Sequence, residues 1–293
     1  MVNNTNQSTV MLVKPIYPCQ NVPVVVFSKR CPKPCLYCDL CKRDFPKNAI
    51  LASGKKAVLE KLKKSKGAYF SAVSDCFLPT NRELTHNIIK NVWKAKPNFV
   101  PLIVTKQSIP QKTINLFIKN KQRIVMQIST PSLNNKLLSI LEPGGASVSK
   151  RLKTIEKLTK GGVSVTAVVM PWFNIYTENE NITDLPKELA KVGVTRCIIG
   201  TGVLPPNQRQ KMINTNNKAI QYAVKQMTEE RKVTTKIGYT LPIKERILLF
   251  SELISAFSKF GIKARICTAD NADLIDKVKL PLCTKFKHPY FLS

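Results

Sequence analysis

The stretch FSKRCPKPCLYC, residues 27–38, decides how the rest of the sequence is interpreted. It places Cys31, Cys35 and Cys38 in a Cys-x-x-x-Cys-x-x-Cys run. Three thiols this close together suit a metal centre, and cysteine thiolates are the usual ligands of iron-sulfur clusters. A cluster of four irons held by three thiolates keeps one iron open to a small molecule. The run therefore favours an iron-sulfur cluster with an open iron.

Two other metal sites are compatible with these cysteines. Cys41 could complete a zinc site, because structural zinc is typically held by four protein ligands. Cys35, Cys38 and Cys41 also begin a ferredoxin-type run, but Phe45 stands where that run requires its fourth cysteine. A framework of disulfides is disfavoured, because nine cysteines are spread over 293 residues and four of them lie within residues 31–41.

The length and composition suit a globular protein. A chain of 293 residues, 43% of them hydrophobic, suits a single barrel-like unit with a substantial core. No apolar run is long enough to cross a bilayer. Residues 1–13 lack the basic start and apolar middle of a secretion signal, so we expect a cytoplasmic protein.

The chain is strongly basic. It has 47 Lys and Arg residues against 18 Asp and Glu residues, for a formal net charge of +29. The cations are densest in residues 55–66, 119–123, 150–160 and 277–287. Such a surplus favours association with a polyanion, and nucleic acid is the expected partner. The alternative is that these cations are solvated helix faces or reflect the general composition of the host's proteins.

The hydrophobic pattern alternates between strand-like and helix-like segments, which indicates a parallel sheet with crossover helices. We expect strands at residues 24–27, 69–73, 101–105, 123–129, 163–169, 195–200 and 263–268. Residues 1–22 are an N-terminal extension, residues 23–200 the core, and residues 201–293 a C-terminal elaboration. In the elaboration a polar loop with Pro205 and Pro206 precedes helical segments at residues 216–231 and 243–260.

The cysteine run resembles the signature of the radical S-adenosylmethionine (SAM) superfamily. The resemblance implies a [4Fe-4S] cluster whose open iron binds the amino and carboxylate groups of SAM. Tyr37 fits as well, because an aromatic residue commonly precedes the last cysteine in this superfamily and lies near the adenine. The implied fold is the partial (β/α)6 radical SAM barrel, here with a helical C-terminal elaboration.

The residues that follow the expected strands narrow the resemblance, because the chemistry of parallel barrels lies at the carboxyl ends of their strands. Polar or proline-containing segments stand at these places: Ser74-Asp75, Thr105-Lys106, Ser129-Thr130, Leu141-Glu142-Pro143 before Arg151, and Pro171. Over residues 23–175 this order is similar to that of the spore photoproduct lyase family and the wider group of DNA repair photolyase-like proteins.

The resemblance also implies roles for individual residues. Ser74 would contact the methionine or ribose part of SAM, Lys106 its carboxylate, and Ser129 the ribose hydroxyls. Asp75 and Arg151 are further candidates for the same site. From the sequence alone, each of these residues has an ordinary alternative, such as a turn residue, a surface charge or a helix cap.

One departure from the family concerns hydrogen transfer. The resemblance implies a hydrogen-donating cysteine two positions before Ser74, but this position is Ala72. Cys76 is a candidate donor from the following loop, and the alternative is a structural thiol. Four further cysteines are not at metal-ligand spacing, and they are Cys19, Cys197, Cys267 and Cys283.

The expected function is reductive cleavage of SAM to a 5'-deoxyadenosyl radical, which abstracts hydrogen from a nucleic-acid substrate in a lyase-like or modifying reaction. A flavodoxin or a ferredoxin is the expected electron donor. Two alternatives stay open. One is a radical SAM enzyme that modifies a protein or peptide. The other is a non-catalytic nucleic-acid-binding protein with zinc at Cys31, Cys35, Cys38 and Cys41.

Overall fold

The computed structural model describes residues 10–15, 22–28, 31–38, 47–71, 73–173, 181–233, 236–275 and 277–283. The strands are β1 (Met11–Val13), β2 (Val24–Val26), β3 (Ile50–Ser53), β4 (Gly67–Phe70), β5 (Val100–Thr105), β6 (Val125–Ser129), β7 (Val165–Val169), β8 (Arg196–Ile199), β9 (Glu229–Val233), β10 (Lys236–Thr240), β11 (Lys263–Cys267) and β12 (Leu282–Cys283). Ten of them form one sheet in the order β12-β11-β8-β7-β6-β5-β4-β2-β1-β3. Neighbours from β2 to β12 are parallel, whereas β1 pairs antiparallel with β2 and β3.

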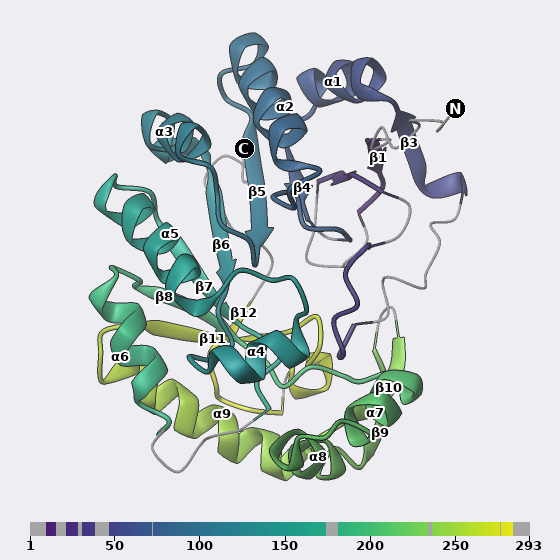
Figure 1. The fold of residues 1–293 in the computed structure, drawn as a ribbon, viewed down its shortest axis with the longest axis vertical. Helices are drawn as coiled ribbons and strands as arrows, with labels where there is room; N and C mark the ends of the chain where they lie inside the picture. Colours follow the sequence, from purple (N-terminus) through teal and green to yellow (C-terminus); the bar gives the residue numbers. More distant parts are fainter. Residues whose placement is uncertain are drawn as a thin grey trace.

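Helices connect the strands of this sheet along the chain. They are α1 (Lys55–Lys64), α2 (Arg82–Ala95), α3 (Gln111–Lys119), α4 (Asn135–Leu141), α5 (Val148–Lys160), α6 (Asp184–Lys191), α7 (Pro206–Ile213), α8 (Lys218–Lys225) and α9 (Ile243–Ser258), with 3-10 turns η1 (Lys47–Ala49), η2 (Lys121–Arg123) and η3 (Ala272–Leu274). Figure 1 shows α2, α3, α5, α6 and α9 around the outside of the sheet. Among the helices in the described ranges, none is long and apolar enough to cross a membrane.

The alternation of side chains along the strands defines the two faces. In β6, Met126 and Ile128 are buried in the hydrophobic core under the outer helices. Successive strand residues point to opposite faces, so Gln127 and Ser129 face the other side. We call this side the inner face of the sheet.

The alternating fold predicted from the sequence is confirmed. The parallel strands β2 and β4 to β8 match the six expected strands of the core, with ends that coincide or shift by at most three residues. The largest shift is in β4, which ends at Phe70 although the pattern extends to residue 73. Ser71, the next residue, has a positive φ of 76°, which ends the extended conformation.

The C-terminal elaboration differs from the prediction in two places. Helix α7 begins at Pro206, within the expected polar loop, because proline is well tolerated in the first turn of a helix. The helix expected at residues 216–231 ends at Lys225 as α8, and the next strand, β9, pairs antiparallel with β10. Four of the five residues of β9 are charged, so the apolar pattern that marks a strand is weak there.

The N-terminal segment contributes to the sheet. Residues 11–13, expected to lie in an extension before the core, form β1, whose side chains are all buried. The sheet therefore incorporates part of residues 1–22, while the division of the chain into three domains stays a prediction.

The elaboration also packs against the cysteine loop. A hydrophobic cluster joins Leu137 and Leu141 of α4 to residues of α7 and α8 that include Met212 and Ile220. Leu36 and Tyr37 of the cysteine loop pack against this cluster. The second half of the chain thus helps to position the loop that carries the predicted metal ligands.

Candidate functional site

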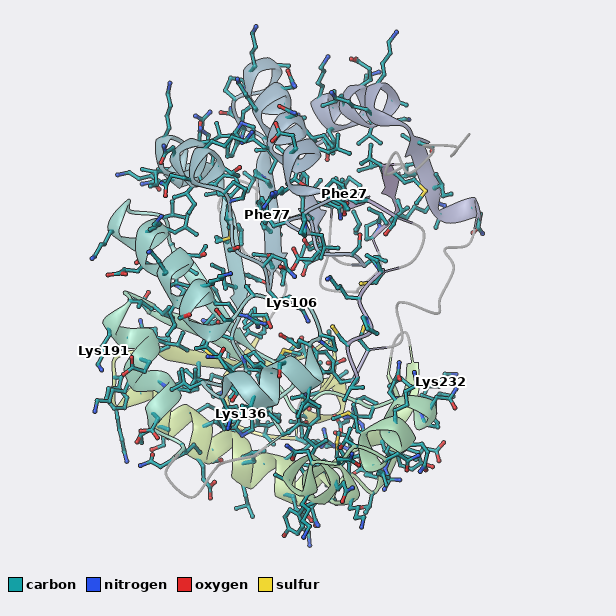
Figure 2. The ribbon with its side chains drawn as sticks, viewed as in Figure 1. Phe27, Phe77, Lys106, Lys136, Lys191 and Lys232 are labelled. Atoms are coloured by element: carbon teal, nitrogen blue, oxygen red, sulfur yellow. The ribbon has the colours of Figure 1, made fainter. Side chains whose placement is uncertain are left out.

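Three of the predicted SAM-binding residues follow or end neighbouring strands. Ser74 lies after β4, Lys106 directly follows β5, and Ser129 is the last residue of β6. These strands pair in parallel, so their carboxyl ends lie at one edge of the sheet. Figure 2 shows Lys106 near the middle of the molecule, surrounded by the ring of outer elements. The structure thus brings the three residues to one edge.

Asp75 joins the end of β4 to the end of β5. Its Oδ1 accepts hydrogen bonds from the Thr105 hydroxyl at 2.7 Å and from the Phe77 amide at 2.9 Å. Its Oδ2 accepts from the Lys106 amide at 2.8 Å. Burial raises the pKa of Asp75, although these hydrogen bonds oppose the shift. Asp75 therefore fixes the backbone that carries Lys106, and its direct contact with SAM stays a prediction.

The ammonium of Lys106 lies between three groups. Its Nζ is 2.9 Å from Glu142 Oε1, 2.6 Å from the Tyr37 hydroxyl and 3.8 Å from Cys35 Sγ. The Tyr37 hydroxyl also donates a hydrogen bond to Glu142 Oε1. One lysine thus connects the end of β5, the residue after α4 and the cysteine loop.

The other oxygen of Glu142 is held by Arg151. Arg151 Nη2 is 2.6 Å from Glu142 Oε2, and both side chains are almost completely buried. The same guanidinium donates from Nε to the Ala146 carbonyl at 2.8 Å and from Nη1 to the Ser129 carbonyl at 2.9 Å. Arg151 therefore holds Glu142 and the backbone at the end of β6 in place. A direct contact of Arg151 with SAM stays a prediction.

The charges of this network stabilise one another. Burial by itself would raise the pKa of Glu142, but Lys106 and Arg151 outweigh it and lower the pKa to about 2. Burial opposes the charge of Lys106, but Glu142 and Tyr37 raise its pKa well above the ordinary value. Burial, followed by Glu142, raises the pKa of Tyr37. At neutral pH the network is an ionised carboxylate between two cations and a neutral phenol.

Glu142 is the residue that sequence reasoning missed as a site member. It stands in the quoted Leu141-Glu142-Pro143 segment, but nothing local shows that it is buried. The available signal is an acidic residue directly after an apolar helical turn, in a chain with few acids. Its partners lie 9, 36 and 105 residues away, so only the fold identifies them.

The backbone of the cysteine loop is held by hydrogen bonds between its last two cysteines and to two helices. The Cys38 amide donates to the Cys35 carbonyl at 3.1 Å, which closes a turn. The Leu36 amide donates to the Leu141 carbonyl at 3.0 Å. Gln208 of α7 donates from Nε2 to the Cys38 carbonyl at 2.6 Å. The loop therefore has partners in both α4 and α7.

The three cysteines are close in sequence but do not meet at one point. Within the described ranges, no three histidine, cysteine, aspartate or glutamate side chains converge closely enough to hold a metal ion. Cys41, the alternative fourth ligand, and Ala72 lie outside the described residues. Holding a cluster therefore requires the three thiols to turn toward a common point.

Cys76 lies in the hydrophobic core. It is fully buried among residues that include Phe77 and Ile88, on the helix side of the sheet. Its amide donates to Ser71 Oγ at 2.7 Å, and burial raises the pKa of its thiol well above the ordinary value. This position favours the structural alternative, and hydrogen donation by Cys76 stays a prediction.

Several buried polar atoms at this edge of the sheet have no hydrogen-bond partner among the described residues. They are Ser74 Oγ, Thr130 Oγ1 and Thr201 Oγ1, and another such atom is Gln208 Oε1 of α7, beside the cysteine loop. Thr130 directly follows β6, and Thr201 lies two residues after β8. Buried polar groups are nearly always paired, so unpartnered atoms after neighbouring strands are candidates for contact with a bound ligand. Thr130 and Thr201 were not predicted, although Thr130 adjoins the predicted Ser129.

The sequence comparisons give a limited result. No family model matches the chain. The chain is 28% identical over 135 residues to the uncharacterized protein ORF301 of Acidianus two-tailed virus, a match that covers 45% of this chain. The match spans 44% of that curated relative, less than half of its length.

The structural comparisons identify the fold. A variant of spore photoproduct lyase with bound AdoMet and dinucleoside spore photoproduct superposes with a TM-score of 0.59 at 18% identity, covering 81% of this chain and 74% of that one. SuiB of Streptococcus suis bound to S-adenosylmethionine gives a TM-score of 0.50 at 13% identity, covering 81% of this chain and 48% of that one. Both are radical SAM enzymes. The chain therefore has the radical SAM fold, as the cysteine run and the order of strands predict.

The Glu142 network leads to a prediction on stability. Glu142→Gln keeps the shape of the side chain but removes the charge between two buried cations. We expect the free energy of unfolding to fall by about 3 kcal/mol, because removing one partner leaves a buried charge uncompensated. Urea unfolding followed by circular dichroism measures this change.

Glu60→Gln is the matched control, because Glu60 forms an ion pair with Lys63 at an exposed position of α1. We expect its unfolding midpoint to stay close to that of the wild type, since exposed pairs contribute little. Equal effects of the two substitutions would show that the Glu142 network does not hold the site together.

Proposed function

We propose that the protein is a radical SAM enzyme that holds a [4Fe-4S] cluster on Cys31, Cys35 and Cys38 and binds SAM at the fourth iron. The observation that carries this proposal is the group of buried, unpartnered polar atoms at the same edge of the sheet as Lys106. The amino, carboxylate and hydroxyl groups of SAM supply the partners that such atoms need. The shared radical SAM fold supports the same proposal.

The residues present fit a cluster with one open iron. Three thiols are the right kind and number of ligands, since iron-sulfur clusters are held by cysteine thiolates. Binding requires the thiolate form. Burial raises the pKa of Cys35, but Lys106 at 3.8 Å opposes this shift. The ammonium thus favours the form of Cys35 that binds iron.

Lys106 would orient SAM through its carboxylate. An ammonium has three N–H donors, and here they face Glu142, Tyr37 and Cys35. With Cys35 bound to one iron of the cluster, the donor that faces its sulfur would become available to the SAM carboxylate, which would be held at the neighbouring open iron. Glu142 and Tyr37 fix the other two donors. Lys106 is therefore positioned before SAM binds, which reduces the entropy lost on binding.

Ser74 and Ser129 would hold the rest of SAM. The Ser74 hydroxyl is buried and unpartnered, and Ser129 faces the inner side of the sheet at the same edge. When bound, the cluster would supply the electron that cleaves SAM to a 5'-deoxyadenosyl radical for hydrogen abstraction. A flavodoxin or a ferredoxin is the proposed donor of that electron. The buried edge keeps water away from the reacting groups.

The proposed substrate is a nucleic acid, and the inner face of the sheet favours it. In β8 and β11, Cys197, Ile199, Ala264 and Ile266 pack into the core under the outer helices. Arg196, Lys263 and Arg265 are therefore on the inner face, where all three are exposed. None of the three forms an ion pair with an acidic side chain of the described residues.

The strand registers connect these cations to the candidate site. Ser129 pairs with Val168, Val168 with Ile198, and Ile198 with Arg265. Arg265 thus lies three strand spacings from Ser129 on the same face, roughly 14 Å away. Unpaired cations at this distance suit the phosphates that flank a target nucleotide.

Cleavage of SAM is the first test of the proposed function. We expect protein reconstituted anaerobically with iron and sulfide to form 5'-deoxyadenosine from SAM and dithionite, measured by liquid chromatography. Cys35→Ala removes a cluster ligand and should abolish both iron binding and product. Cys197→Ala, a buried thiol of β8 outside the site, should retain both.

Two results would contradict the proposal. One is a well-formed cluster that yields no 5'-deoxyadenosine with SAM and reductant. The other is stoichiometric zinc that is retained after aerobic purification, which is the behaviour of a structural zinc site.

Binding to nucleic acid is the second test. Because phosphate contacts release counterions, the affinity for a 20-base-pair duplex DNA, measured by fluorescence anisotropy, should fall steeply as salt rises. We expect the double variant Arg196→Gln, Arg265→Gln to make the negative slope of log affinity against log salt shallower by about 2, one for each lost phosphate contact.

Lys90→Gln with Lys94→Gln removes the same charge from exposed positions of α2, on the outer side of the sheet. This control should change the slope by much less. Equal effects of the two double variants, or an affinity that does not depend on salt, would reject the inner face as the binding surface. Binding of an acidic peptide in preference to DNA would favour a protein substrate instead.

A further inference from the structure

Gln208 connects the C-terminal elaboration to the cysteine loop. It lies on α7 and is 2% exposed. Its Nε2 donates to the Cys38 carbonyl at 2.6 Å, across 170 residues of sequence. A residue far from the cysteine motif thus holds the backbone of the last predicted iron ligand.

The other end of the same amide is unsatisfied. Gln208 Oε1 is buried and has no hydrogen-bond partner among the described residues. Exchanging the amide oxygen and nitrogen would not resolve this, because the oxygen would then face the Cys38 carbonyl, which is also an acceptor. The contact with Cys38 therefore fixes Oε1 as the free acceptor.

Helix α7, which carries Gln208, is held in place by its neighbouring residues. Met212, four residues further along the helix, is fully buried in the cluster that also contacts Tyr37 and Phe173. Arg209, the next residue, donates to the Met227 carbonyl at 3.2 Å and stacks over the Tyr239 ring at 4.8 Å. The acceptor is thus presented by a well-packed helix, and since no described residue supplies a donor, a bound ligand is a fitting source of one.

We infer that Gln208 Oε1 binds the exocyclic amino group of the adenine of SAM. This rests on the proposed function, in which iron and Lys106 take the methionine part of SAM and Ser129 takes the ribose. The exocyclic amine is the N–H donor of SAM that these contacts leave unassigned. The aromatic rings of Tyr37 and Phe173, 6.3 Å apart in the adjoining cluster, offer an apolar surface for a flat base.

This contact makes Gln208 a residue that determines specificity for the base. A 6-oxo purine carries an oxygen in place of the amino group, so two acceptors would face each other. A site that hydrogen-bonds a ligand group discriminates strongly against an analogue without it, because its own polar atom is left unpaired. Gln208 should therefore select the amino purine.

The test compares SAM with S-inosylmethionine, its 6-oxo analogue, in equilibrium dialysis against the anaerobically reconstituted protein. We expect the wild type to bind SAM at least about tenfold more tightly than the analogue. Gln208→Leu removes the acceptor and should bring the ratio of the two affinities close to one. The ratio separates base recognition from any general loss of affinity caused by the lost bond to Cys38.

Gln210→Leu is the matched control, because Gln210 is an exposed residue of the same helix. It should keep the wild-type ratio. The inference is overturned if the wild type binds both nucleosides equally, or if Gln208→Leu keeps the wild-type preference. If Gln208→Leu fails to fold, the ratio of the two affinities in the wild type still tests the inference. A reconstituted wild type that binds neither nucleoside overturns the proposed function as well.

Discussion

The buried carboxylate of Glu142 is the interaction on which the candidate site depends. One oxygen holds Arg151 of α5, and the other holds Lys106 after β5 and Tyr37 of the cysteine loop. Arg151 in turn fixes the carbonyls of Ser129 and Ala146. A buried carboxylate is tolerated only with good partners, so each of these contacts supports the others. The end of β6, the end of β5 and the cysteine loop thus share one electrostatic centre.

The cysteine loop is also held by the C-terminal elaboration. Gln208 of α7 binds the Cys38 carbonyl, and Leu36 and Tyr37 pack with the hydrophobic cluster of α4, α7 and α8. The barrel core supplies Lys106 through its strand ends, while the C-terminal elaboration supplies Gln208. The elaboration therefore contacts the cysteine loop directly, and it places a buried acceptor without a described partner beside the last cysteine.

Short-range patterns predicted the parallel core and the edge of the sheet where the site lies. Strand β7 and helix α5 follow directly from periodic apolar residues, and Lys106 and Ser129 from their place after strands. Glu142 and Gln208 could not be found in this way, because their burial results from contacts 36 and 170 residues away. The β9-β10 pair was missed because four of the five residues of β9 are charged, so the apolar alternation that marks a strand is weak there.

The central claim is that three cysteines of this chain hold a cluster with one open iron. The most direct measurement is the Mössbauer spectrum of protein reconstituted with isotopically enriched iron, recorded without and with SAM. The account predicts that about one iron in four changes its isomer shift when SAM is added, because only the iron without a cysteine ligand can bind it. A spectrum in which no iron responds to SAM would contradict the account.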